Sequence, residues 1–159
     1  MDLSIAMDNA VIGQHPGITF GLHLCRGNNQ SRFYAAGDYG PIARIFRNTR
    51  FQRFLLEYDD ERSGGFEPLR QLPDDRTVVL GLVSSKKPGL ENKDELKSRI
   101  EAASAFVPLE RLALSPQCGF ASTMEGNLVT PADQDAKLKL VAETAREVWG
   151  KPEPMAHRL

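Results

Sequence analysis

The chain has 159 residues, of which 41% are hydrophobic and 26% charged, as in an ordinary globular protein of about one domain. Its net charge of −1 offers no positive field for nucleic acid, and no apolar run approaches the roughly 20 residues that cross a membrane. The first residues lack the features of a secretory signal, so we expect a cytoplasmic protein with neither a nucleic-acid nor a membrane partner.

The chain is expected to open on a short helix over residues 3–12, which ends at Gly13 and leads into a turn at His15-Pro16-Gly17. Short runs rich in Val, Leu, Ile and Phe then predict four strands, at residues 18–24, 54–58, 77–83 and 111–115. Between the third and fourth strands, residues 92–106 have helical spacing, with Leu96, Ile100 and Ala103 on one face. Strands and helical segments therefore alternate.

The last helix is expected over residues 131–149, with Thr130 as its N-cap, Pro131 at the first helical position and Gly150 just past its end. An apolar stripe is expected to face the core and consists of Leu138, Val141, Ala142, Ala145 and Trp149. We assign this stripe to packing and give it no chemical role.

Alternating strands and helices favour an α/β fold in which a parallel sheet is covered by helices. Four strand-helix units are half of the eight that close a TIM barrel, so the chain reads like the second half of a larger barrel. We expect residues 1–150 to form this partial catalytic domain and residues 151–159 to be a C-terminal tail.

Potential metal ligands lie at the carboxyl ends of three of the four predicted strands. His23 and Cys25 lie two residues apart at the end of the first strand, and therefore on one side of it. Glu57 follows the apolar core of the second strand, and Cys118 follows the fourth. Because the carboxyl ends of parallel strands meet at one rim of the sheet, we expect these four side chains to converge.

Thiolate, imidazole and carboxylate are the ligands that zinc takes in tetrahedral geometry, whereas magnesium and calcium prefer oxygen. Zinc with two thiolates and one carboxylate leaves a site of charge near −1, which suits thiol alkylation better than hydrolysis. Structural roles for the two cysteines stay open, because the H-x-C spacing is weak by itself. A disulfide between them is disfavoured, because the chain has no C-x-x-C motif.

Two neighbouring segments have alternative interpretations. The acidic run from Asp59 to Arg62 either shapes the mouth of the site or, more often for such a run, is a solvated loop. Arg26, Asn28 and Asn29 follow the H-x-C residues and either contact a carboxylate or a pterin or are solvated. Neither pattern decides between its alternatives.

From about residue 17 to residue 150 the chain resembles the carboxyl-terminal half of the catalytic barrel in the cobalamin-independent methionine synthase family. The resemblance is carried by GLHLCRGN at 21–28, FLLEYD at 54–59, VLGLVS at 79–84 and LSPQCGF at 114–120. It implies a UROD/methionine synthase-like TIM barrel and zinc as the cofactor. The implied ligands are His23, Cys25, Glu57 and Cys118.

The resemblance also implies transfer of a methyl group from 5-methyltetrahydropteroyltriglutamate to the thiol of homocysteine, giving methionine. Two departures from the family affect this implication. The strands and substrate-binding residues that precede this region in the family are missing, and no histidine follows the strand at 77–83, where the chain has Ser84-Ser85-Lys86-Lys87. The departures suggest a shorter paralogous branch, in which other thiol acceptors such as coenzyme M are also used.

Two hypotheses follow. In the first, the chain is an S-methyltransferase that is complete only in a homo-oligomer or with a separate amino-terminal half, because a four-stranded parallel sheet exposes both of its edges. In the second, it is a non-catalytic truncated paralogue or barrel-completing subunit that binds zinc. Methyl transfer by the purified zinc-loaded chain would discriminate between them.

Overall fold

A computed structural model describes residues 1–151, so His157 and most of the predicted tail at 151–159 lie outside the described residues. The helices and strands are α1 (Asp2–Gly13), β1 (Gly21–Leu24), α2 (Arg44–Asn48), β2 (Arg53–Glu57), β3 (Thr77–Val83), α3 (Lys93–Ser104), β4 (Leu112–Pro116) and α4 (Pro131–Trp149). Short 3₁₀ turns lie at Gly40–Ile42, Glu61–Ser63, Glu67–Gln71 and Leu109–Arg111. In this described part, no helix is both long and apolar enough to cross a membrane.

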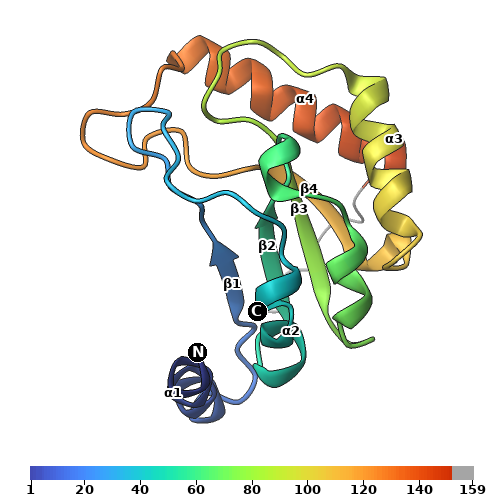
Figure 1. Ribbon diagram of the computed structural model, residues 1–159. Coiled ribbons are helices and arrows are strands. Elements are labelled where there is room, and N and C mark those ends of the chain that lie inside the picture. Colours follow the sequence, from blue (N-terminus) through green and yellow to red (C-terminus); the bar gives the residue numbers. More distant parts are fainter. Residues whose placement is uncertain (152–159) are drawn as a thin grey trace, which may run out of the picture.

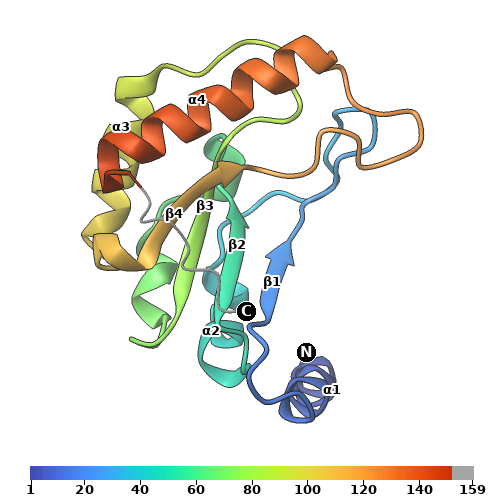
Figure 2. The same ribbon diagram turned by 180° about the vertical axis from the view of Figure 1, so that it is seen from behind.

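The four strands form one parallel sheet in the order β1-β2-β3-β4, which confirms the predicted α/β fold (Figures 1 and 2). The strand at 77–83 has its predicted bounds, and β2 and β4 are each shifted by one residue. β1 begins three residues later than predicted, at Gly21. Before it, the backbone N–H of Phe20 donates to the side chain of Gln52 at 2.7 Å rather than to a neighbouring strand.

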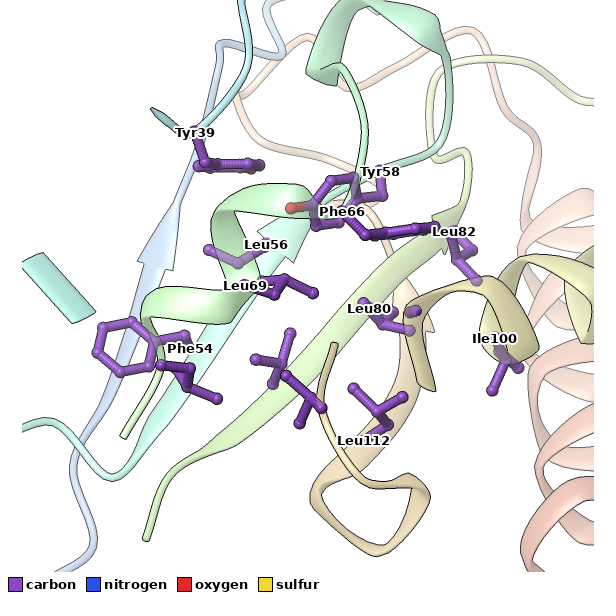
Figure 3. Close-up of a cluster of buried hydrophobic side chains, with 14 of the residues drawn as sticks. Tyr39, Phe54, Leu56, Tyr58, Phe66, Leu69, Leu80, Leu82, Ile100 and Leu112 are labelled. Carbon is purple, nitrogen blue, oxygen red and sulfur yellow. The ribbon is translucent and has the colours of Figure 1, made fainter. Parts of the chain in front are cut away.

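One face of the sheet packs against the helices to form the core (Figure 3). Because strand residues alternate between faces, Phe54 and Leu56 of β2 enter this core, whereas Leu55 and Glu57 lie on the opposite face. The ring of Phe54 packs edge-on against Phe46, with ring centroids 5.0 Å apart. Further buried side chains include Leu69, Val78, Leu80, Leu82, Ile100 and Leu112. This packing fixes which residues of each strand face away from the helices.

The predicted helix at 92–106 is confirmed as α3, and Leu96, Ile100 and Ala103 form its buried face. Asn92 is the N-cap rather than the first helical residue, because its side chain accepts hydrogen bonds from the next turn. α1 is likewise confirmed close to its predicted bounds. Figure 1 shows it beside the amino-terminal end of β1, away from α3 and α4.

The bounds of α4 match the prediction, as does its cap: Thr130 and Asp133 form a reciprocal capping box. The predicted apolar stripe is confirmed only in part: Val141 and Trp149 pack against the core, but Leu138 is exposed and the buried residues are Lys137, Leu140 and Thr144. The physical reason is an ion pair, in which the buried Nζ of Lys137 lies 3.0 Å from Glu91. This pair turns Lys137 toward the protein interior.

Candidate metal centre

The predicted ligands come from three strands and meet at one rim of the sheet. His23 lies in β1 and Cys25 directly follows it, Glu57 ends β2, and Cys118 lies two residues beyond β4. One ligand atom from each of the four side chains lies within 4.8 Å of the others. The structure therefore brings all four predicted residues together.

The separations fit a tetrahedral zinc ion. Two sulfur atoms bound at roughly 2.3 Å from one tetrahedral ion lie about 3.8 Å apart. The Sγ atoms of Cys25 and Cys118 lie 3.8 Å apart. Two thiol sulfurs, an imidazole and a carboxylate are also a donor set that zinc prefers. The residues present thus fit zinc in both spacing and chemistry.

The ring of His23 is oriented by the neighbouring strand. Its Nδ1 lies 3.3 Å from the carbonyl oxygen of Leu55, which is its register partner in β2. A carbonyl oxygen can only accept, so Nδ1 carries the proton and donates it to Leu55. The lone pair is then on Nε2, which is the arrangement of a histidine ligand whose other nitrogen bonds to the protein.

Glu57 is completely buried at the end of β2. Its Oε1 accepts a hydrogen bond from the backbone N–H of Arg26 at 3.0 Å, and its Oε2 lies 3.3 Å from the guanidinium of Arg62. A buried carboxylate is costly unless it is hydrogen-bonded and paired, and both conditions are met here. These contacts hold the carboxylate at the rim.

The acidic run after β2 is solvated only in part: the side chains of Asp59 and Arg62 are buried, whereas Asp60 is partly exposed and Glu61 is exposed. The guanidinium of Arg62 lies 2.7 Å from a carboxylate oxygen of Asp59 and also pairs with Asp60. It lies over the ring of Phe33 at 4.9 Å. Arg62 therefore compensates a cluster of carboxylates that includes Glu57.

The two thiols differ in acidity. A hydrogen bond with His23 is the largest cause that lowers the pKa of Cys118 to about 6. The same hydrogen bond raises the pKa of His23. Partial burial raises the pKa of Cys25, although the Gly27 N–H that bonds its sulfur at 3.3 Å acts in the opposite direction. Cys118 is thus the thiol that ionises first, and thiolate is the form in which cysteine binds a metal.

The residues that follow Cys25 are mostly buried. Arg26 stacks on the ring of Tyr39 at 4.4 Å, and Asn28 is buried by the loops after β3 and β4, whereas Asn29 is exposed. Of Arg26, Asn28 and Asn29, each of which was expected either to contact a substrate or to be solvated, only Asn29 is solvated. The sequence did not predict the burial of Tyr39, because a lone tyrosine among turn residues belongs to no periodic apolar pattern.

The loop after β3 contributes a buried lysine. Lys86 is buried, and its Nζ donates a hydrogen bond of 2.8 Å to the carbonyl oxygen of Gly27. Burial lowers the pKa of this ammonium group. Lys86 therefore ties the loop after β3 to the loop that carries Cys25.

A cavity of about 240 Å³ adjoins the cluster on the sheet face that carries His23. Its lining residues are His23, Leu55, Leu56, Ser115, Pro116, Gln117, Cys118 and Gly119. A small molecule in this cavity would contact two of the four clustered residues.

Relatives among known proteins share this region. The uncharacterized proteins YxjG and YxjH of Bacillus subtilis are 50% and 46% identical to the chain over 91% and 90% of its length. A methionine synthase of Thermococcus kodakarensis is 27% identical over 72% of the chain. The chain spans only 39%, 38% and 30% of the length of these three relatives.

Two solved structures have the same fold. A Listeria monocytogenes protein described as a vitamin-B12-independent methionine synthase matches 89% of the chain with 32% identity and a TM-score of 0.65, and the chain covers 38% of it. A B12-independent methionine synthase from Shewanella, solved with selenomethionine, matches 92% of the chain with a TM-score of 0.72, and the chain covers 43% of it. At 17% identity, the second likeness concerns the fold alone.

The family model of the cobalamin-independent synthase catalytic domain matches residues 54–144, which is more than half of the chain. This match includes Glu57 and Cys118 and the whole of β3 and β4. It agrees with the resemblance drawn from the sequence motifs and with the folds of the two solved structures. The chain belongs to the cobalamin-independent synthase family, as part of its catalytic domain.

Proposed function

We propose that this chain is the zinc-binding part of a methyltransferase that moves a methyl group from 5-methyltetrahydropteroyltriglutamate to a thiol. The ligands would be His23, Cys25, Glu57 and Cys118. The observation that carries the proposal is the convergence of these four ligand atoms within 4.8 Å, in a chain of the cobalamin-independent synthase family. Homocysteine, which would give methionine, is the proposed acceptor.

Zinc, when bound, would supply Lewis acidity that keeps a thiol ionised at neutral pH. The chain's own residues would hold the ion and orient the acceptor. His23 presents its Nε2 to the cluster because its Nδ1 is held by Leu55, and the cavity beside Cys118 gives a thiol-bearing molecule access to the rim. Fixing the sulfur in line with a methyl group would supply much of the rate.

Glu57 is the ligand that we expect to move when a substrate thiol arrives. Its two carboxylate oxygens already have partners in the backbone of Arg26 and in the guanidinium of Arg62. A carboxylate that withdraws from the ion would therefore stay hydrogen-bonded and paired.

Residues 1–150 would form one part of a barrel whose remaining strands come from elsewhere. The chain spans 38% to 39% of its two Bacillus relatives, and β1 and β4 are the two outer strands of its sheet. An amino-terminal half, either as a separate polypeptide or from a second copy, would complete the substrate site. The alternative is a zinc-binding subunit or paralogue without activity of its own.

Zinc content tests the proposed site. The purified chain is stripped with a chelator, reloaded with zinc and measured by elemental analysis, together with Cys118→Ser and His23→Ala. We expect one zinc per chain, and clearly less in both variants. His15→Ala, at an exposed histidine outside the cluster, is the matched control and should keep the full content. Full zinc content in all variants would reject the ligand set.

Methyl transfer tests the reaction. The zinc-loaded chain is supplied with the methyl-folate donor and either homocysteine or coenzyme M, alone and mixed with the amino-terminal region of the Bacillus relative YxjG. We expect a methylated thiol, detected by mass spectrometry, that depends on His23 and Cys118. If the zinc-loaded chain transfers no methyl group to either thiol, neither alone nor mixed with the amino-terminal region of YxjG, the non-catalytic alternative is supported.

A further inference from the structure

Strand pairing does not explain why the sulfur atoms of Cys25 and Cys118 lie close together. β1 and β4 are the outermost strands of the sheet and are not hydrogen-bonded to each other. Even so, Cys25 and Cys118 bring their Sγ atoms to 3.8 Å. The loops after these strands lie side by side in both views of the fold (Figures 1 and 2) and are joined by the hydrogen bond from Leu128 N to Ser31 Oγ.

The most direct link between the two cysteine loops is the side chain of Asn28, three residues after Cys25. Its Nδ2 donates to the carbonyl oxygen of Gly119, next to Cys118, at 3.0 Å. The same Nδ2 donates its second N–H to Ser85 Oγ at 3.2 Å. The amide orientation is determined, because the carbonyl of Gly119 can only accept. Asn28 is 5% exposed, so water does not compete for these bonds.

Ser85 extends the link to the residue that precedes Cys118. Its hydroxyl donates to Gln117 Oε1 at 2.7 Å while its oxygen accepts from Asn28, so donors and acceptors alternate along the chain of bonds. The backbone N–H of Ser85 also donates to Gln117 Oε1, at 3.2 Å. Ser85 and Gln117 are both fully buried. The loop after β3, which brings no side chain to the metal cluster, thus connects the two loops that do.

We propose that Asn28 is a positioning residue that sets the separation of Cys25 and Cys118 through its paired N–H donors, with Ser85 as its support. The use of this separation for zinc rests on the function proposed above. The positioning itself is a property of the two thiols and can be measured without metal. Loss of these donors should increase the separation of the two sulfurs, because the bonds that remain, from Leu128 to Ser31 and from Lys86 to Gly27, do not reach the residue next to Cys118.

Asn28→Asp is the informative substitution. It keeps the shape of the side chain but replaces both N–H donors by an oxygen that faces the carbonyl of Gly119. Asn29→Asp is the matched control, since it makes the same chemical change and adds the same charge one residue further on, at an exposed position. Loss of a residue that orients metal ligands typically lowers metal affinity about 10- to 100-fold.

The first readout is the tendency of the two thiols to pair. The metal-free protein is equilibrated with reduced and oxidised glutathione, so that Cys25-SH plus Cys118-SH plus glutathione disulfide gives the Cys25–Cys118 disulfide and two reduced glutathiones. The equilibrium constant reports the effective concentration of one thiol near the other. We expect Asn28→Asp to lower this equilibrium constant at least about tenfold, which is the lower end of the loss in metal affinity given above. Asn29→Asp should leave the equilibrium constant within twofold of the wild-type value.

The second readout is the visible spectrum of the protein loaded with Co²⁺, in which the absorption bands report tetrahedral geometry and thiolate ligation. We expect weaker bands in Asn28→Asp and unchanged bands in Asn29→Asp. Ser85→Ala removes one acceptor of Asn28 and leaves Gly119, so it should shift both readouts in the same direction by less. If Asn28→Asp does not fold, Ser85→Ala still tests whether the bonds of Asn28 position the two sulfurs.

Unchanged thiol pairing in folded Asn28→Asp and Ser85→Ala would overturn the proposal. A wild-type chain that binds neither zinc nor cobalt would count against the proposed function. The glutathione equilibrium would still show whether Asn28 positions the two sulfurs. The two failures are therefore distinguishable.

Discussion

The hydroxyl group of Tyr39 bonds both backbone polar groups of Glu57. It accepts from the Glu57 N–H at 2.8 Å and donates to the Glu57 carbonyl oxygen at 3.2 Å. Both residues are buried, so neither backbone group has water as an alternative partner. A single side chain thus fixes the backbone of the residue that brings the carboxylate to the metal cluster.

Tyr39→Phe should destabilise the fold and loosen this end of β2. The substitution removes only the hydroxyl and leaves a buried N–H and a buried C=O unpaired, at about 1–3 kcal/mol for each unsatisfied group. Urea unfolding followed by circular dichroism measures the loss. Tyr34→Phe removes a hydroxyl from an exposed tyrosine and should leave the unfolding free energy unchanged. Equal stability of the two variants would contradict the role given to Tyr39.

The alkylation rate of the metal-free protein should show two different thiols. Because the pKa of Cys118 is lowered to about 6 by His23, this thiol should already be mostly thiolate at pH 7 and react as fast there as at pH 8. The pKa of Cys25 is raised by burial, so its rate should still be rising above pH 9. Iodoacetamide labelling, with the modified peptide identified by mass spectrometry, separates the two.

His23→Ala tests whether His23 causes the lowered pKa of Cys118. Without the imidazole, the pKa of Cys118 should rise from about 6 toward the ordinary thiol value, and its labelling rate at pH 7 should fall by roughly tenfold for a rise of about two units. His15→Ala should leave the profile as it is. A Cys118 rate that does not respond to loss of His23 would show that another group acidifies the thiol.

Lys137→Met should destabilise the packing of α4. The buried ammonium of Lys137 donates to the carbonyl of Gly89 at 2.6 Å and pairs with Glu91 at 3.0 Å, so its removal leaves both acceptors without this partner. Loss of one partner of a buried pair costs about 3–5 kcal/mol, and the partial exposure of Glu91 favours the lower end. Thermal or urea unfolding measures the change.

Lys139→Met is the matched control on the same helix. Lys139 is exposed and its nearest carboxylate, Glu143, lies 3.9 Å away. A surface pair of this kind contributes little, so its loss should stay within roughly 0.5 kcal/mol. Similar costs for the two lysine variants would mean that the pair between Lys137 and Glu91 does not hold the helix.

The elements and the convergence of the site could be predicted because they follow local patterns. Periodic apolar residues marked β3 and α3, and the Thr130-Pro131 start marked α4. The rule that parallel strands end at one rim was enough to bring His23, Cys25, Glu57 and Cys118 together. Their role as ligands rests on the proposed function.

The errors came from pairings between distant parts of the chain. The buried face of α4 depends on Glu91, 46 positions before Lys137, and Arg62 of the acidic run is covered by the ring of Phe33 from an earlier loop. The link from Asn28 to Gly119 joins residues 91 positions apart. Such contacts have no periodicity or local spacing, so composition and pattern could not distinguish these side chains from solvated ones.

X-ray absorption spectroscopy at the zinc edge of the reloaded protein identifies the atoms that surround the metal. We expect two sulfur neighbours at roughly 2.3 Å and two nitrogen or oxygen neighbours at about 2.0–2.2 Å. One sulfur neighbour should disappear in Cys118→Ser. A zinc ion surrounded only by nitrogen and oxygen, or a spectrum that Cys118→Ser leaves unchanged, would contradict a metal centre built by these four residues.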